Sequence, residues 1–274
     1  MKPSDISYCQ ATLNYSNESG NQPVSVNIGD GRAALDELDY ESCGFTLLEH
    51  RSAVTDWGDE SQLRDVHIPE IESLARAFTG CDRAAAYPAL VRSPLTALES
   101  TDYAPIQFVH SDYSDDYRRM IEDPDRPYHA FLAPTLERAG LSQQDIANAD
   151  RVLMLQFWRN IGAERPDYPF ALCDAATVPR SQLYAFTVDE YAGTRLEFEV
   201  LCVTPPADPD DHHWYTFPGL QDSEVIAFRT YDSRCADENE PFWTPHSAFR
   251  DSVAGPDAPQ RESLEMRVLC LFGV

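Results

Sequence analysis

Apolar and polar residues alternate along much of the second half of the chain, which is the pattern of half-buried β-strands. Residues 105–113 show this alternation, and residues 151–158 form a nearly continuous apolar run typical of a buried strand. Such strand patterns, spaced regularly, predict a sandwich or barrel of antiparallel strands. The further strand candidates are residues 23–27, 45–50, 182–188, 195–203, 213–217, 224–231 and 263–272.

Helical patterns lie mostly before residue 150. The apolar side chains of residues 68–78 share one helical face. Ser142, with Asp145 three residues later, predicts the start of another helix through a capping box. We therefore expect a mostly β core with flanking helices, in a single domain over residues 1–274, with residues 1–40 as an N-terminal extension packed on that core.

The charge balance excludes several classes of partner. Forty-six acidic residues oppose 21 basic ones, which gives a net charge of -25. A surface for duplex nucleic acid or for an anionic membrane needs clustered basic residues, so we expect neither. The N-terminus lacks the apolar core of a signal peptide, and the seven cysteines are scattered singly. Reduced thiols in a cytoplasmic protein fit this pattern best.

His110 and Asp112 end the alternating strand at 105–113. Because residues i and i+2 of a strand project from the same face, an imidazole and a carboxylate converge there. With one distant histidine they would form the facial triad that binds Fe(II) and leaves positions open for other ligands. The HxD triplet alone is a weak signal, since such triplets occur by chance in many proteins.

The C-terminal region offers the missing histidine. His246 precedes Arg261 by fifteen residues, and Arg261 and Ser263 open the last strong strand. A guanidinium and a hydroxyl on one face suit a carboxylate, which arginine binds with two parallel hydrogen bonds. Arg267 lies six residues after Arg261 and is the rival anchor. The order HxD, His, RxS is that of the metal ligands and co-substrate anchor in Fe(II)/2-oxoglutarate oxygenases.

Several separated blocks resemble one family within that class: the group containing the cephamycin 7α-methoxylation component and related fungal hydroxylase/desaturases. The resemblance covers about residues 40 to 272. The blocks that carry it are GFTLLEHRSAVTDW (44–57), PIQFVHSDYS (105–114), FWRN (157–160), PFALCDAATV (169–178), HWYTFPGLQDSEVIAFRTYDS (213–233), HSAF (246–249) and RESLEMR (261–267).

This resemblance implies a double-stranded β-helix, the jelly roll or cupin-like fold, over residues 105–272 with a helical insert at 115–150. It implies Fe(II) held by His110, Asp112 and His246, with 2-oxoglutarate bound by Arg261 and Ser263 and dioxygen as oxidant. The implied reaction is hydroxylation or desaturation of a small molecule, such as a natural product or an amino-acid derivative, while 2-oxoglutarate is decarboxylated to succinate. Because halogenases of this chemistry lack the carboxylate ligand, Asp112 favours hydroxylation or desaturation over halogenation.

The substrate does not carry over from the family. The family's segment before Trp-Arg has Asn where this chain has Gln156. We expect the pocket to be lined by Tyr113, Trp158, Arg159 and Trp214, although core packing explains the tryptophans equally well. Two alternative functions stay open: a non-haem iron oxidase that needs no 2-oxoglutarate, and a catalytically silent cupin-like binding protein. A homodimer also stays open.

Overall fold

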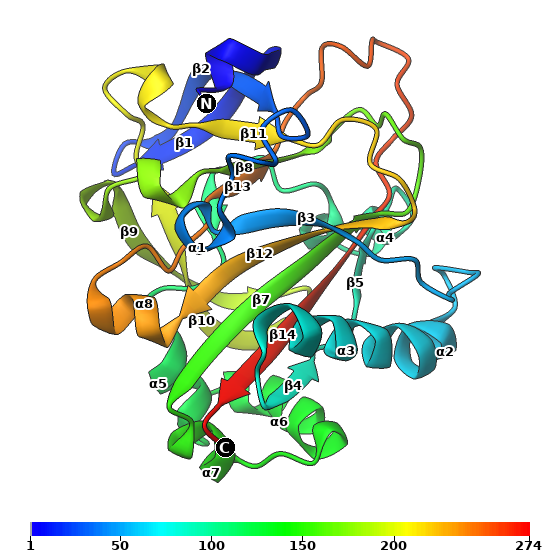
Figure 1. Cartoon of the computed structure of the whole chain (residues 1–274), viewed down its shortest axis with the longest axis vertical. Coiled ribbons are helices and arrows are strands. Elements are labelled where there is room, and N and C mark those ends of the chain that lie inside the picture. The colour runs from blue at the N-terminus through cyan, green and yellow to red at the C-terminus, as the bar shows by residue number, and fades with distance from the viewer. Residues whose placement is uncertain (1) are drawn as a thin grey trace.

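The computed structural model describes residues 2–274, and two β-sheets dominate it (Figure 1). Apart from the parallel pair β2–β11, neighbouring strands run antiparallel. The first sheet has the order β1 (Ser7–Asn17), β2 (Gly20–Asp30), β11 (Trp214–Thr216), β8 (Phe170–Cys173), β13 (His246–Ala248), β6 (His110–Ser111), β10 (Thr194–Val203), β9 (Leu183–Tyr191). The second has the order β3 (Phe45–Glu49), β12 (Glu224–Asp232), β7 (Arg151–Asn160), β14 (Ser263–Phe272), β4 (Arg83–Ala86), and β5 (Leu90–Arg92) also pairs with β14.

Short helices surround the sheets. The α-helices are α1 (Tyr40–Cys43), α2 (Glu60–Gln62), α3 (Ile68–Thr79), α4 (Thr96–Glu99), α5 (Tyr117–Glu122), α6 (Tyr128–Ala139), α7 (Gln143–Asn148) and α8 (Ser233–Glu238). A π-helical turn, Leu63–His67, joins α2 to α3. Single 3-10 turns occupy Pro3–Ile6, Thr101–Tyr103, Ala175–Thr177, Arg180–Gln182 and Pro209–Asp211. The mostly β composition predicted from the sequence is confirmed.

The N-terminal residues form a hairpin that belongs to the first sheet. β1 and β2 pair over ten residues each, and β2 joins the sheet through β11. The sequence analysis missed β1, although Cys9, Ala11, Leu13 and Tyr15 are buried and alternate with more exposed neighbours. Gln10, Thr12 and Asn14 between them are polar, so the alternation was a local signal that could have predicted this strand. Residues 7–30 therefore form strands of the sheet.

The two sheets face each other across an aromatic layer. Phe170 of β8, in the first sheet, stacks on Trp158 of β7 at 5.1 Å and contacts Phe228 of β12 at 5.4 Å. The outer face of the second sheet packs against α3, whose buried Ile71 and Ala75 belong to one cluster with residues of β7 and β14. Side chains that project inward beside this aromatic layer therefore lie between the two sheets.

The helices predicted from the sequence form where expected. α3 covers the predicted segment 68–78 and ends at Gly80, whose positive φ of 72° is a common way to end a helix. α7 begins after Ser142, whose side chain accepts from the backbone of Asp145, while the Asp145 carboxylate accepts from the backbone of Ser142. α5, α6 and α7 lie together at the lower end of the molecule in Figure 1.

Candidate metal centre and active site

Two histidines meet because the strand register places them opposite each other. His110 of β6 and His246 of β13 are Cα partners in the antiparallel pairing. Directly opposed residues project to the same face, with Cβ atoms about 4.5–5.5 Å apart. The two ring centroids are 4.3 Å apart, and both side chains are buried. Two residues far apart in the sequence thus present their imidazoles to one point.

Asp112 completes the group from the end of β6. Its Oδ1 lies 3.6 Å from Nε2 of His110 and 3.4 Å from Nε2 of His246. One ligand atom from each of the three residues lies within 4.8 Å of the others. Two imidazole nitrogens and one carboxylate oxygen at these separations fit Fe(II) bound at one face of its coordination sphere. The structure brings together the three residues that the sequence analysis selected.

Each imidazole is oriented by a backbone carbonyl two residues earlier. Nδ1 of His110 donates to the carbonyl of Phe108 at 2.9 Å, and Nδ1 of His246 donates to the carbonyl of Thr244 at 3.0 Å. These bonds place the proton on Nδ1 and leave the Nε2 lone pair toward the group, as in metal-binding histidines. Burial, and then the neighbouring His246, lower the pKa of His110 to about 3, so its ring is neutral near pH 7.

The second oxygen of Asp112 faces an arginine of the opposite sheet. Oδ2 accepts from Nε of Arg267 at 3.0 Å and lies 2.8 Å from its terminal nitrogen. Burial alone would raise the pKa of Asp112, but Arg267 and then the two imidazoles hold that pKa well below its usual range. Asp112 is therefore an ionised carboxylate with one oxygen toward the histidines and one toward the arginine.

Arg261 is a buried guanidinium with little to bind. It precedes β14 and lines the same pocket as the three ligand candidates. Its Nη1 donates to the carbonyl of Tyr168 at 3.3 Å, while Nε has no hydrogen-bond partner within residues 2–274. Burial, and then Arg92, lower the pKa of Arg261 to about 9. The hydroxyl of Ser263 is also buried and lacks a partner in the described chain, but Ser263 is not among the residues that line this pocket. The unsatisfied Nε of Arg261 fits a carboxylate ligand.

A second ion pair leaves Arg261 as the surplus charge of the pocket. Glu265 accepts from Nε of Arg92 at 2.7 Å and from Nε2 of Gln156 at 2.7 Å. Arg92 therefore neutralises Glu265, as Arg267 neutralises Asp112. The histidines apart, the charged groups that line the pocket are three arginines and two carboxylates, which together carry one net positive charge. This favours an anion beside Arg261.

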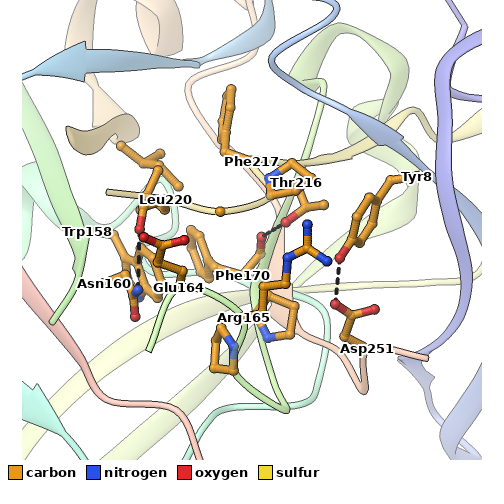
Figure 2. A pocket seen from close by; sticks show the side chains of 15 residues that line it. Tyr8, Trp158, Asn160, Glu164, Arg165, Phe170, Thr216, Phe217, Leu220 and Asp251 are labelled. Atoms are coloured by element: carbon orange, nitrogen blue, oxygen red, sulfur yellow. Dashed lines mark hydrogen bonds between the residues drawn. The ribbon is translucent and has the colours of Figure 1, made fainter. Parts of the chain in front are cut away.

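The aromatic pair Trp158 and Phe170 separates this pocket from a neighbouring one. The two rings are nearly parallel, at 8°. Both line the metal-site pocket, and both also line the pocket shown in Figure 2. There they lie beside Asn160, whose Oδ1 is buried without a partner in the described chain. The guanidinium carbon of Arg261 lies 5.7 Å from the centroid of the Trp158 ring.

Three residues expected in the pocket lie elsewhere. Arg159 follows Trp158 on β7 and projects to the opposite face, where its Nη2 contacts Nδ1 of His50 at 2.6 Å. Trp214 donates from Nε1 to the hydroxyl of Tyr15 inside the core. Tyr113 is buried against Tyr117 and hydrogen-bonds Tyr128. None of these three side chains lines the pocket in this structure. Of the four expected side chains, Trp158 is the one that lines it.

The sequence analysis missed several residues of the pocket. Glu265 could have been found from parity, because Ser263, Glu265 and Arg267 share one face of β14. Phe170 lies in a block that carried the family resemblance but was not selected. Arg92 has no local signal, since β5 reaches the pocket through its pairing with β14. Long-range pairing therefore decides this part of the site.

Comparison with known proteins identifies the family. The domain family described as "Oxidoreductase/YMDC permease-like domain" matches residues 2–271. The chain belongs to this family. Within residues 2–274, no helix combines the length and the apolar character that crossing a membrane requires. This member of the family has two β-sheets and a buried group of two histidines and one aspartate.

Curated relatives of this family member are fungal oxygenases. The chain is 27% identical to the alpha-ketoglutarate-dependent dioxygenase phiK of a fungal species, over 90% of this chain and 84% of phiK. It is 23% identical to the Fe(II)/2-oxoglutarate-dependent dioxygenase nvfI of Aspergillus novofumigatus, over 92% and 84%. It is 22% identical to the hydroxylase/desaturase CTB9 of Cercospora beticola, over 82% and 70%. The predicted resemblance to these oxygenases is confirmed, while the link to the cephamycin component stays a prediction.

A solved structure shares the fold. The iron and alpha-ketoglutarate-dependent endoperoxidase NvfI superposes with a TM-score of 0.74 over 98% of this chain and 99% of NvfI, at 19% identity. This likeness confirms the jelly-roll core for the family member described here. At this identity the likeness concerns the fold, so the roles of single residues rest on the geometry of this chain.

Proposed function

We propose that this protein is a non-haem Fe(II)- and 2-oxoglutarate-dependent oxygenase that hydroxylates or desaturates a small molecule. The observation that carries the proposal is the convergence of His110, Asp112 and His246 beside Arg261, a buried guanidinium whose Nε has no hydrogen-bond partner among the described residues. The donor set suits Fe(II), and the guanidinium suits the distal carboxylate of 2-oxoglutarate. The names of the curated relatives support the same chemistry.

The chain's own groups would divide the work. His110, Asp112 and His246 would hold the metal, and Arg261 with Ser263 would orient 2-oxoglutarate. When bound, Fe(II) and 2-oxoglutarate together supply the activation of dioxygen, oxidative decarboxylation to succinate and oxidation of a substrate C–H bond. The backbone carbonyls of Phe108 and Thr244 keep both imidazoles in the tautomer that presents Nε2.

Most side chains that line the pocket are buried. Trp158 and Phe170 form an aromatic wall beside the metal site, and Phe170 lies 5.3 Å from the ring of His246. Arg267 and Arg92 keep the two carboxylates of the pocket paired. Preset charges among buried side chains strengthen the electrostatic attraction that an anionic co-substrate meets on entry.

The proposal extends to the setting of the enzyme. We propose a single oxygenase domain in the cytoplasm, because all seven cysteines are free and buried in the described structure. The substrate would be a natural product or an amino-acid-derived compound, and the net charge of -25 argues against nucleic acid. A homodimer is compatible with this proposal.

Alanine variants of the histidines test the proposed function. His110→Ala and His246→Ala should each lower Fe(II) affinity at least about tenfold and abolish 2-oxoglutarate-dependent oxygen consumption, because each removes one of three ligands. His129→Ala is the matched control, since His129 lies on α6 and bonds Gln143 instead. The measurements are anaerobic titration with Fe(II) and 2-oxoglutarate, followed by visible charge-transfer absorption, and oxygen uptake with and without 2-oxoglutarate.

Two outcomes would contradict the proposal. Full oxygen uptake without added 2-oxoglutarate would identify an oxidase that takes its electrons elsewhere. A wild-type protein that shows no visible band under any anaerobic condition would indicate a binding protein with the same fold.

A further inference from the structure

The two oxygens of Asp112 have different surroundings. Oδ1 is the atom within 3.6 Å of both histidine Nε2 atoms. Oδ2 receives both contacts from Arg267, at 3.0 Å from Nε and 2.8 Å from the terminal nitrogen. Both guanidinium contacts converge on one oxygen, whereas the common fork geometry places one donor on each oxygen. Oδ1 of Asp112 therefore faces the proposed metal position, and Oδ2 faces Arg267.

We propose that Arg267 is a positioning residue that restricts Asp112 to a single-oxygen ligand. This inference rests on the proposed function. Three protein donors leave three positions of an octahedral ion for a bidentate co-substrate and dioxygen. If Asp112 offered both oxygens, one of these positions would be lost. Arg267 prevents this because Oδ2 is held from the opposite sheet by one charge-assisted hydrogen bond, from Nε, and by a close ionic contact with the terminal nitrogen.

Arg267 is available to Asp112 because Glu265, the carboxylate two residues before it in the sequence, already has other hydrogen-bond partners. Glu265 lies two residues before Arg267 on the same face of β14 and would otherwise compete for its guanidinium. Arg92 and Gln156 occupy the two oxygens of Glu265, at 2.7 Å each. Gln156 is also the Cα partner of Arg267 across β7 and β14. The neighbouring strand thus leaves Arg267 free to serve Asp112.

The backbone of Arg267 is held in place by the strands on both sides of β14, so its contact with Asp112 starts from a fixed position. β14 pairs with β7 along its whole length and with β4 and β5 on its other side. Asp112 follows a strand of the other sheet, so the ion pair joins the two sheets at the metal site. A rigid strand in one layer therefore sets the orientation of a ligand in the other.

Substitution of Arg267 tests the inference through the metal itself. Arg267→Met removes both donors and the charge, and Arg267→Lys keeps the charge on a single nitrogen. We expect Arg267→Met to weaken Co(II) binding about 10- to 100-fold, the usual effect of losing an outer partner of a metal ligand. The visible absorption of bound Co(II) should also change, because a second Asp112 oxygen would replace one of the other ligands of the ion. Arg267→Lys should lie between Arg267→Met and the wild type.

Arg151→Met is the matched control. Arg151, the first residue of β7, makes a comparable pair with Asp232, with Nε 2.9 Å from Oδ1. This pair lies beside Phe272, five residues along β14 from Arg267. The substitution should change thermal stability and leave Co(II) affinity and absorption unchanged. Folding of every variant is checked by circular dichroism, and Arg267→Gln replaces Arg267→Met should the latter not fold.

Each result has a defined meaning. Wild-type affinity and absorption in a folded Arg267→Met variant would overturn the inference. An increased KM for 2-oxoglutarate with unchanged Co(II) binding would also overturn it, and would make Arg267 the co-substrate anchor. If the wild type itself bound neither Fe(II) nor Co(II), the proposed function would fail first. The inference is supported when the metal signal changes in Arg267 variants alone.

Discussion

At the scale of single residues, two arginines with similar sequence positions have different partners. Arg261 and Arg267 lie six residues apart, and the sequence offers Arg261 as the carboxylate anchor with Arg267 as its rival. In the structure Arg267 is committed to Asp112, while Arg261 is buried with an unpartnered Nε among the described residues. An arginine that already holds a carboxylate is a poor anchor for another. We therefore propose Arg261 as the anchor.

This assignment predicts a divided effect for Arg261→Met. The KM for 2-oxoglutarate should rise at least about tenfold, since a charge-assisted hydrogen bond is worth about 1.5–3 kcal/mol. Stability without ligand should not fall, because the substitution removes a buried charge that lacks a carboxylate partner. Steady-state kinetics and thermal unfolding measure the two quantities.

Arg250→Met serves as the control for this pair of measurements. Arg250 is half exposed and lies over Tyr168, near the pocket but outside its lining. An unchanged KM in Arg261→Met would return the anchoring role to another residue. A large loss of stability would indicate that Arg261 is a structural residue.

At the scale of elements, strand alternation decides which side chains reach the pocket. Trp158 and Arg159 are adjacent on β7, so they must face opposite sides. Trp158 faces the metal site, whereas Arg159 donates to the backbone carbonyls of His50 and Asp222 and contacts the His50 ring. Selecting both residues from the sequence was inconsistent with the strand that contains them. The alternation of side chains along a strand would by itself have excluded one of the two from the pocket.

Arg159→Met therefore tests whether Arg159 stabilises the fold from the outer face of β7 and has no role in the metal site. It should lower the free energy of unfolding by about 1–3 kcal/mol, because buried carbonyls that now accept hydrogen bonds lose their donor. The KM for 2-oxoglutarate and the affinity for Fe(II) should remain those of the wild type. Denaturant unfolding and anaerobic titration give the two values. Arg51→Met provides the control, as Arg51 is exposed and its contact with Asp222 is 3.9 Å. Weaker Fe(II) binding by a folded Arg159→Met would place Arg159 in the site after all.

At the scale of the whole molecule, the charge of the pocket opposes the charge of the protein. The chain carries -25 overall, while the metal-site pocket holds one surplus arginine. A dianion approaching the molecule is repelled at long range and attracted at close range. Screening acts mainly on the long-range part, because buried charges are less exposed to salt.

Salt should therefore assist the co-substrate. Raising the ionic strength from about 0.01 M to about 0.1 M shortens the Debye length from about 30 Å to about 10 Å. We expect kcat/KM for 2-oxoglutarate to rise at least about twofold over this range. Association of Fe(II) provides the internal control, because a cation should show the opposite dependence. A fall in kcat/KM with salt would show that the positive pocket also dominates at long range.

Most of the fold class and the core of the site could be predicted from local patterns. The regular strand spacing, the HxD triplet at a strand end and the distant histidine all depend on short stretches of sequence. β1 could also have been predicted, because apolar and polar residues alternate strictly from Cys9 to Tyr15. Arg92 and Phe170 escaped because they join the site through pairing between distant strands.

The sequence by itself determined the residue types available: one paired histidine and aspartate, one later histidine, and arginines near the last strand. Only the tertiary structure decided their partners. The register of β6 with β13 placed the two imidazoles together, and the facing of the two sheets gave Arg267 to Asp112 and left Nε of Arg261 unpaired within the described chain. The reason is physical: hydrogen-bond register and sheet packing act between residues far apart in the chain, and local periodicity carries no information about them.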